Sequence, residues 1–369
     1  MKNIPLFKVY MRPGVEIPLK EVIYSGYIGQ GKKVEEFEEL LKEKFQHPYV
    51  VTTNSATSGL HLLLHLLGNR DSDVEVLTSP LTCTATNWPI LANNYKIKWV
   101  DVDDSCNMDL EDLERKITEK TKIIMLVHWG GNPVNLDEIA EIKWRCFNKF
   151  DFEPIIIQDA AHSIGTKWNN IHISYFWNSA FSFQAIKHFT TIDGGCIILH
   201  NKKLYKRAKS LRWYGIDREQ KSEDFRCELP IKEWGYKFHM NDVNATVGIH
   251  NFPHIDSIVE KHVENSNYYD SQEINGVTKI LKHPLAYSSQ WIHTIHVERR
   301  DDFMRMMKEN GIMVSRVHER NDKHDCVSEF RTLLPGLEKV IKTMVCIPNG
   351  WWVSPEEREY IAETMKKGW

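Results

Sequence analysis

The chain has 369 residues, of which 42% are hydrophobic, and its 47 basic and 50 acidic side chains leave a formal net charge of -3. This hydrophobic fraction is enough for a sizeable core, and two lobes are expected because single cores stop growing at roughly 250–300 residues. The balanced charge lacks the basic footprint of a general nucleic-acid binder, and the apolar runs are far too short to cross a bilayer.

The cysteine pattern and the N-terminal residues indicate the cellular compartment of the protein. The 7 cysteines are scattered and form no CxxC pair, which is typical of a reduced, intracellular protein without a zinc site. The first residues, MKNIPLFKVYMRPG, contain no apolar stretch of the kind that a signal peptide needs. We therefore expect a cytoplasmic protein that holds no metal ion and contacts neither a membrane nor nucleic acid.

The first half of the chain alternates between helical and strand patterns. Helical spacing covers Val34–Phe45, Ala56–Gly68, the region near Leu110–Lys120 and Asn135–Phe147, where Asn135 is the expected cap. Short β-rich or apolar runs lie between them at 48–53, 74–80, 97–103, 122–129 and 153–159. This alternation predicts an α/β fold with a mostly parallel sheet that helices cover on both faces. Ligands of such sheets bind at the carboxyl ends of strands, which are residues 53–57, 82–86, 128–131 and 159–162.

The pattern changes after about residue 250. Strands are expected at Trp291–Val297 and Ile312–Val317, and helices at Arg300–Asn310 and Pro355–Lys367. We therefore predict a large domain at residues 1–250 and a smaller α+β domain at residues 251–369.

Lys187 is the first candidate for chemistry, in the stretch SFQAIKHFTTIDGG. The glycines follow the lysine, so the stretch is not a P-loop. It lies between a β-like run and the strand GGCIILH, where charge is otherwise scarce. A lysine in such a place tends to have a lowered pKa, and its neutral amine can form a covalent imine with a carbonyl. A solvated surface lysine is the alternative.

Asp159 ends a buried strand and opens DAAHS. It is either the cap of a following helix or a carboxylate that pairs with the protonated ring nitrogen of pyridoxal phosphate. A phosphate site for that cofactor is available at Ala56 and Thr57, which open a helix, with Ser182 and Lys237 as further partners. The alternatives are that Thr57 only caps its helix and that Lys237 is only solvated.

Six ordered segments resemble motifs of the DegT/DnrJ/StrS family of sugar aminotransferases, which use pyridoxal 5′-phosphate on the type I aminotransferase fold. The segments are SGYIGQGKKVEEFE, NSATSGLHLLL, HWGGNPVNLD, QDAAHSIGT, SFQAIKHFTTIDGG and GYKFHMNDVNATVG. They extend over almost the whole chain. The resemblance implies the family's large cofactor-binding domain, with a mostly parallel mixed sheet, and a smaller C-terminal domain.

The resemblance also implies roles for single residues. Lys187 would bind the cofactor covalently and move a proton, Asp159 would pair with the pyridine nitrogen, and His162 would lie near the cofactor's O3′. Ala56, Thr57 and Ser182 would bind the phosphate. An asparagine of the family reaches the phosphate of the neighbouring subunit, and Lys237 occupies its position, which implies a homodimer with shared active sites.

Besides Lys237, further positions depart from the family pattern. The family's ring-stacking aromatic residue is replaced by Cys83, so either Cys83 packs on the ring or Trp88 or Trp129 supplies the stacking face. A glycine and a glutamate before the paired glycines are replaced by Ile192 and Asp193, and the sequence gives no reason for Ile192.

The activity implied by the resemblance is amino transfer from L-glutamate to a keto-sugar. We favour C4 of a dTDP- or UDP-linked 4-keto-6-deoxyglucose, which would give a 4-amino-4,6-dideoxy sugar. A GDP-perosamine-type enzyme, a C3-keto-sugar enzyme and an aminotransferase for a non-nucleotide octulosonate are alternatives. Candidate substrate contacts are Arg212, Arg316, His318 and Arg320, for which solvated surface charge is the competing interpretation.

Two other functions are compatible with the same fold. Some relatives are deoxysugar dehydratases with a histidine in place of the lysine, but here the histidine is His188, one position later, and Lys187 is present. A non-catalytic binding protein that uses the fold of pyridoxal phosphate enzymes is the second alternative. Such a protein has no chemical need for both Lys187 and Asp159, so the intact pair favours an enzyme.

Overall fold

The computed structural model describes residues 3–68, 73–220 and 230–369, and its centre is a mixed sheet of seven strands in the order β1-β9-β8-β5-β4-β2-β3. The strands are β1 (Val50–Thr53), β2 (Glu75–Thr78), β3 (Lys96–Trp99), β4 (Thr121–Val127), β5 (Ile155–Asp159), β8 (Asn178–Ser182) and β9 (Gly195–Ile198). The strands from β3 to β8 are parallel neighbours, whereas β9 runs antiparallel to β8 and β1. The predicted mostly parallel mixed sheet is therefore confirmed.

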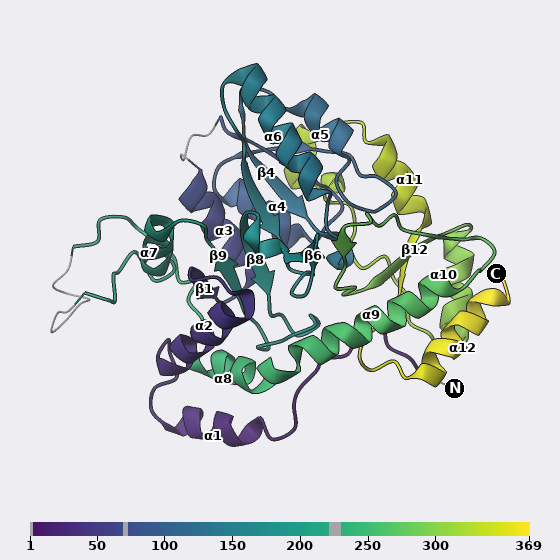
Figure 1. The fold of residues 1–369 in the computed structure, drawn as a ribbon, viewed down its shortest axis with the longest axis horizontal. Helices are drawn as coiled ribbons and strands as arrows, with labels where there is room; N and C mark the ends of the chain where they lie inside the picture. The colour runs from purple at the N-terminus through teal and green to yellow at the C-terminus, as the bar shows by residue number, and fades with distance from the viewer. Residues whose placement is uncertain (1–2, 69–72, 221–229) are drawn as a thin grey trace.

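Helices cover both faces of this sheet (Figure 1). One face packs on α3 (Ala56–Leu67), α4 (Thr84–Ala92) and α7 (Lys202–Leu211), and the other packs on α2 (Lys32–Phe45), α5 (Leu110–Lys116), α6 (Leu136–Phe150) and α8 (Asp242–Asn251). In β4, Ile123 and Met125 enter the first core, whereas Ile124 and Leu126 enter the second. Burial on both faces explains why the strands are continuously apolar.

Polar caps fix where the predicted helices begin. The Ser55 side chain accepts the backbone N–H of Ser58 at 3.1 Å at the start of α3. The Asn135 side chain accepts the N–H of Glu138 at 3.1 Å at the start of α6, which confirms the expected cap. Each cap satisfies one of the N–H groups that the first helical turn leaves unpaired.

A second, antiparallel sheet of three strands lies in the C-terminal part of the chain, in the order β10-β12-β13. Its strands are β10 (Val277–Lys279), β12 (His293–Val297) and β13 (Met344–Ile347), and its helices are α9 (Ile255–Ser271), α10 (Arg300–Glu309), α11 (Pro335–Thr343) and α12 (Pro355–Lys366). Ile4 packs in the core of this part, and both chain ends lie beside α12 (Figure 1). The division at residues 1–250 and 251–369 stays a prediction.

Some elements differ from the sequence-based expectation. Residues 312–317 form no continuous strand: Ile312 bridges Ile4, Ser315 bridges Cys346, and Val317 has a φ of 66°, which interrupts an extended run. Among the elements that were not expected are α1 (Glu16–Tyr24) and a small sheet of β6 (Lys167–Trp168), β7 (Ile171–His172) and β11 (Ala286–Tyr287). None of the described helices combines the length and the apolarity that crossing a bilayer requires.

Candidate active site

A cavity of about 350 Å³ opens at one edge of the large sheet. It lies at the carboxyl ends of β1, β2, β4, β5 and β8, which is where ligands of parallel sheets bind. Its lining residues are Ser55, Ala56, Thr57, Leu60, Thr82, Cys83, Ala85, Thr86, Val127, Asp159, Ala161, His162, Ser182, Gln184, Ile186, Lys187, Asp193, Gly194 and His318. Three of the four expected strand ends therefore contribute, whereas residues 128–131 do not.

Lys187 extends from the connection between β8 and β9 into this cavity. Its backbone N–H donates to the carbonyl of Gln184 at 2.9 Å, so a turn follows β8 directly. Burial lowers the pKa of Lys187 to about 8, although the charge of Asp159 acts in the opposite direction. At pH 7 about a tenth of this amine is therefore neutral and available as a nucleophile, far more than for an ordinary lysine.

Asp159 is the last residue of β5 and is buried. Its Oδ2 accepts a hydrogen bond from Thr86 Oγ1 at 2.6 Å, and its Oδ1 accepts the N–H of Ala161 at 3.1 Å. No α-helix follows it, so Asp159 is not a helix cap. Burial raises the pKa of Asp159, although these hydrogen bonds and Lys187 favour its ionised form. The carboxylate is thus held rigidly at the cavity wall.

The N-terminus of α3 supplies the anion-binding part of the cavity. The first N–H groups of a helix have no intrahelical partner and carry the positive end of the helix dipole. Ala56 and Thr57 are the first residues of α3, and both line the cavity with Ser182. A Cβ on Gly195 would lie 2.6 Å from the nitrogen of Ala56, so only glycine lets β9 approach this helix end so closely.

His162 adds a neutral hydrogen-bond donor. Burial lowers its pKa far below the usual range, and the nearby charge of Lys187 acts in the same direction. Its Nδ1 accepts the N–H of Gly130 at 3.3 Å, which places the imidazole proton on Nε2. Its ring stacks on that of Trp291, with centroids 3.9 Å apart.

These groups fit pyridoxal 5′-phosphate. The cofactor needs an amine for its carbonyl, a carboxylate for its ring nitrogen and donors for its phosphate dianion. Lys187, Asp159 and the N-terminus of α3 supply these three groups around one cavity. In the part of the chain that the structure describes, no cluster of three or more His, Cys, Asp or Glu side chains is arranged to hold a metal ion.

The position of the family's stacking residue is filled by a thiol. Cys83 lies just before α4 and lines the cavity. Neither of the tryptophans considered as replacements lines it: the Trp129 indole N–H donates to Thr294 Oγ1 at 3.0 Å, and the Trp88 ring lies 5.7 Å from that of His324. Of the three residues considered for the stacking position, Cys83 is therefore the one that lines the cavity.

Of the four candidate substrate contacts, only His318 lines the cavity. Arg212 is 1% exposed and forms an ion pair with Glu38, so proposing it as a substrate contact was wrong. Arg316 pairs with Glu319 at 2.9 Å, and Arg320 pairs with Asp322 and Glu338. The local sequence did not reveal the partner of Arg212, because Glu38 lies 174 residues away along the chain.

Lys237 and two unexpected residues complete the description. Lys237 is exposed and lies outside the cavity of its own chain. Thr86 and Trp291 touch Asp159 and Lys187, respectively, but were not singled out from the sequence. Thr86 lies within residues 82–86, one of the strand ends at which ligands were expected, so its region was predicted but its role was not. Trp291 lies 105 residues after Ile186, and no local pattern connects the two.

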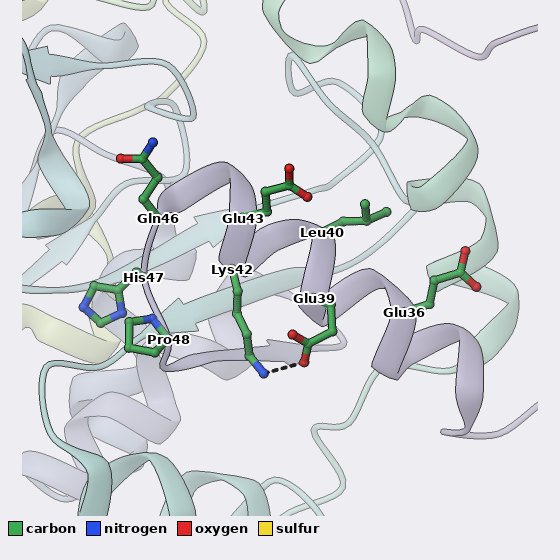
Figure 2. Close-up of a pocket in the computed structure, with 8 residues that line it drawn as sticks. All are labelled: Glu36, Glu39, Leu40, Lys42, Glu43, Gln46, His47 and Pro48. Carbon is green, nitrogen blue, oxygen red and sulfur yellow. Dashed lines mark hydrogen bonds and ion pairs between the residues drawn. The ribbon is translucent and has the colours of Figure 1, made fainter.

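A larger surface hollow of about 730 Å³ runs along α2 (Figure 2). Figure 2 shows its acidic side chains spread along the helix, with Lys42 paired to Glu39 at 2.7 Å. Its lining residues are Glu36, Glu39, Leu40, Lys42, Glu43, Gln46, His47 and Pro48. This lining pairs no nucleophile with a general base, so the hollow is not a second candidate for catalysis.

Comparisons with known proteins agree with this geometry. The family model described as the DegT/DnrJ/EryC1/StrS aminotransferase family matches residues 16–366. The structure of AtS13 from Actinomadura melliaura is 42% identical, with a TM-score of 0.97, and the match covers 100% of both chains. The sugar aminotransferase CalS13 from Micromonospora echinospora is 38% identical, with a TM-score of 0.95, and the match covers 99% of this chain and 100% of that chain.

A curated relative matches over a shorter segment. The UDP-4-amino-4,6-dideoxy-N-acetyl-beta-L-altrosamine transaminase of Campylobacter jejuni is 33% identical over 258 residues, which are 69% of this chain and 64% of the relative. The chain therefore spans less than two thirds of the length of that relative.

Proposed function

This chain belongs to the DegT/DnrJ/EryC1/StrS aminotransferase family, and from that membership we propose that it transfers an amino group from L-glutamate to a nucleotide-linked keto-sugar. Pyridoxal 5′-phosphate is the cofactor of the family, and the cavity residues fit it. The observation that carries the proposal is that Lys187 and Asp159 line one cavity together with the N-terminus of α3. A protein that bound pyridoxal phosphate without catalysing a reaction would not need both this lysine and this carboxylate.

The cofactor supplies an electron sink through which an amino group passes from one substrate to the other. The neutral Nζ of Lys187 would hold the cofactor through its carbonyl carbon and would serve as the group that moves a proton at the reacting carbon. The Asp159 carboxylate would keep the ring nitrogen protonated. The Nε2–H of His162 would be available to an oxygen of the ring, and the N–H groups of Ala56 and Thr57 would hold the phosphate.

We propose C4 of a 4-keto-6-deoxy sugar as the acceptor position, carried on dTDP or UDP. The Campylobacter relative is named for a 4-amino-4,6-dideoxy sugar on UDP, which supports this choice. His318 lines the cavity, and its Nε2 is buried without a hydrogen-bond partner among the described residues, which makes it the candidate contact for a sugar hydroxyl. GDP-linked, C3-keto and octulosonate acceptors remain alternatives for the same site.

We propose further that two copies of the chain form a dimer with shared sites. Large apolar side chains are exposed on α1 and just after it: Ile17 is 64% exposed, Tyr24 81% and Tyr27 83%. Exposed apolar patches are typical of interfaces. Lys237 is exposed outside its own cavity, so its ammonium group is free to reach the phosphate in a second subunit.

Complementation tests the shared site. Lys187→Ala and Lys237→Ala chains are each expected to be inactive, but a mixed dimer carries one site with both lysines intact. Unfolding and refolding the two variants together should restore about a quarter of the wild-type activity. If the mixture stays inactive while the Lys187→Ala and wild-type chains do form mixed dimers, Lys237 does not act across the interface.

The absorption spectrum tests the activity itself. Protein loaded with the cofactor should absorb at about 420 nm, and excess L-glutamate should remove this absorption band. Lys187→Ala should lack the response, whereas Lys203→Ala, which changes an exposed lysine of α7, should keep it. The keto-sugar that restores the band then identifies the acceptor. A band that glutamate leaves unchanged would contradict amino transfer from glutamate and favour the dehydratase or the binding protein.

A further inference from the structure

Trp291 reaches the cavity wall from the C-terminal sheet, just before β12. Its side chain is 1% exposed. The indole Nε1–H donates to the carbonyl of Ile186 at 2.9 Å, and its backbone N–H donates to the carbonyl of Gly130 at 2.8 Å. The ring is therefore fixed by one hydrogen bond from the side chain and one from the backbone.

The segment around Lys187 is tied to the Trp291 segment on both sides of the lysine. Ile186, which precedes Lys187, accepts the indole N–H of Trp291. His188, which follows it, donates from Nε2 to the carbonyl of Ser289 at 2.9 Å. The carbonyl of the next residue, Gln290, accepts a further hydrogen bond from Asn349 at 2.7 Å. These hydrogen bonds hold the residues on both sides of Lys187 and thereby fix its backbone relative to the indole of Trp291.

The lysine side chain then lies against the indole face. Lys187 Nζ is 3.8 Å from the ring centroid of Trp291, well inside the distance at which an ammonium group is attracted by an aromatic face. Within the described parts of the chain, no carboxylate forms an ion pair with Lys187, and Asp159 acts on it only through its more distant charge. The indole is thus the group in direct contact with the ammonium.

We propose that Trp291 is the positioning residue of Lys187: its indole face holds the protonated Nζ, and its Nε1–H fixes the turn from which the lysine extends. This inference deepens the proposed function, on which it rests. In each half of an amino transfer the lysine is first bonded to the cofactor and then free. An aromatic face holds the free ammonium close to the reacting atoms without an ion pair that would have to be broken.

The same indole also fixes His162. The rings of His162 and Trp291 are stacked with an interplanar angle of 18°. Two side chains that line the cavity, Lys187 and His162, thus contact one residue that lies just before β12 of the C-terminal sheet. A shift of that sheet relative to the large sheet would move both together, so Trp291 couples the two parts of the chain at the reacting centre.

Fluorinated tryptophans separate the electrostatic attraction of the Trp291 ring face for Lys187 from the packing of the ring. Mono-, di- and trifluorotryptophan at position 291 keep the shape and the N–H but progressively weaken the negative ring face. The readout is the pH dependence of acetylation of Lys187 by an amine-reactive reagent, measured by mass spectrometry on the full-length, cofactor-free chain. We expect the midpoint to fall with each fluorine, by about one pH unit for three. The same fluorine series at Trp129, which is equally buried but donates to Thr294, should leave the acetylation midpoint of Lys187 unchanged.

A second variant tests the positioning by the N–H group. Trp291→Phe removes the hydrogen bond to Ile186 and presents a weaker aromatic face, so cofactor attachment should slow more than in a fluorinated protein that has the same acetylation midpoint. A midpoint that does not respond to fluorination would overturn the inference. Failure of the proposed function is distinguishable, because it would appear as absent amino transfer in a chain whose acetylation midpoint still follows the fluorine series.

Discussion

Thr86 Oγ1 donates a 2.6 Å hydrogen bond to Oδ2 of Asp159, and both side chains are buried. Thr86 Oγ1 also lies 2.8 Å from Oγ1 of Thr82, so the two hydroxyls form a short chain that ends on the carboxylate. Because burial raises the pKa of Asp159, this donor is one of the few groups that keep the carboxylate ionised.

Removing this hydroxyl should therefore weaken the cofactor site. In Thr86→Val the shape is kept, but the pKa of Asp159 rises further because a stabilising donor is lost. Since the ionised carboxylate holds the ring nitrogen, cofactor affinity should fall about tenfold at neutral pH and more steeply as the pH decreases. Cofactor titrations followed by absorbance measure this.

The matched control is Thr86→Ser, which keeps the hydroxyl and should retain most of the affinity. Equal losses in the valine and serine variants would mean that the methyl group of Thr86, and not its hydrogen bond, supports the site.

The lowered pKa of Lys187 sets the pH dependence of cofactor attachment. Its pKa of about 8 lies below the ordinary lysine value, so the neutral amine becomes the major form above pH 8. The rate of attachment to cofactor-free protein should rise about tenfold per unit below pH 8 and level off above it. Stopped-flow absorbance measures this profile. A rate that still rises at about pH 10 would show that Lys187 has an ordinary pKa.

The pair of Glu38 and Arg212 is structural. Arg212 also donates to the carbonyl of Thr52 at 2.8 Å, and both charged side chains are buried. Arg212→Met should destabilise the protein by about 3–5 kcal/mol, because it leaves Glu38 buried without its partner. Glu38→Gln together with Arg212→Met should regain most of this loss. Chemical denaturation measures both, and the acceptor KM of the double variant should be unchanged.

The Glu38–Arg212 pair also predicts that the free energy of unfolding decreases at acidic pH. Burial tends to raise the pKa of Glu38, but Arg212 and Thr52 outweigh it, so the folded-state pKa lies below the ordinary value of 4.5. The contribution of this carboxylate is thus fully present above pH 4.5 and is lost as the pH falls through its lowered folded-state pKa. The Glu38→Gln, Arg212→Met protein should show a shallower decline in that range.

Ile192 occupies a backbone conformation that suits glycine. It has a φ of 73° and is 48% exposed, so its branched side chain gains little packing for the strain. Ile192→Gly should raise the free energy of unfolding by about 0.5–1 kcal/mol, because the relief of strain exceeds the added flexibility of the unfolded chain. Thermal unfolding of the cofactor-free protein measures this effect.

Ile171→Gly is the matched control, since Ile171 is 47% exposed but lies in the strand β7. This variant should be destabilised, because glycine weakens a strand. If Ile192→Gly is destabilised to the same extent, the side chain of Ile192 has packing partners that outweigh its strain.

The expected strand from Ile312 to Val317 shows where sequence patterns fail for the fold. Its apolar residues suit a strand, but Ile312 and Ser315 bridge two separate partners, Ile4 and Cys346, and the positive φ of Val317 ends the extended run. Strand pairing depends on a neighbour with free backbone groups, and that neighbour is chosen by the tertiary arrangement.

The sequence by itself determined the layers of the large sheet and the neighbourhood of Lys187 and Asp159. Buried parallel strands must be continuously apolar, and ligands bind where such strands end, so both features are local properties of the chain. Only the tertiary structure decided that Arg212 pairs with Glu38 and that the Trp291 ring lies against Lys187, since these partners lie 174 residues apart in the first case and on separate segments, before β12 and between β8 and β9, in the second. Such contacts arise when separate elements pack against each other, and periodicity within one element carries no information about them.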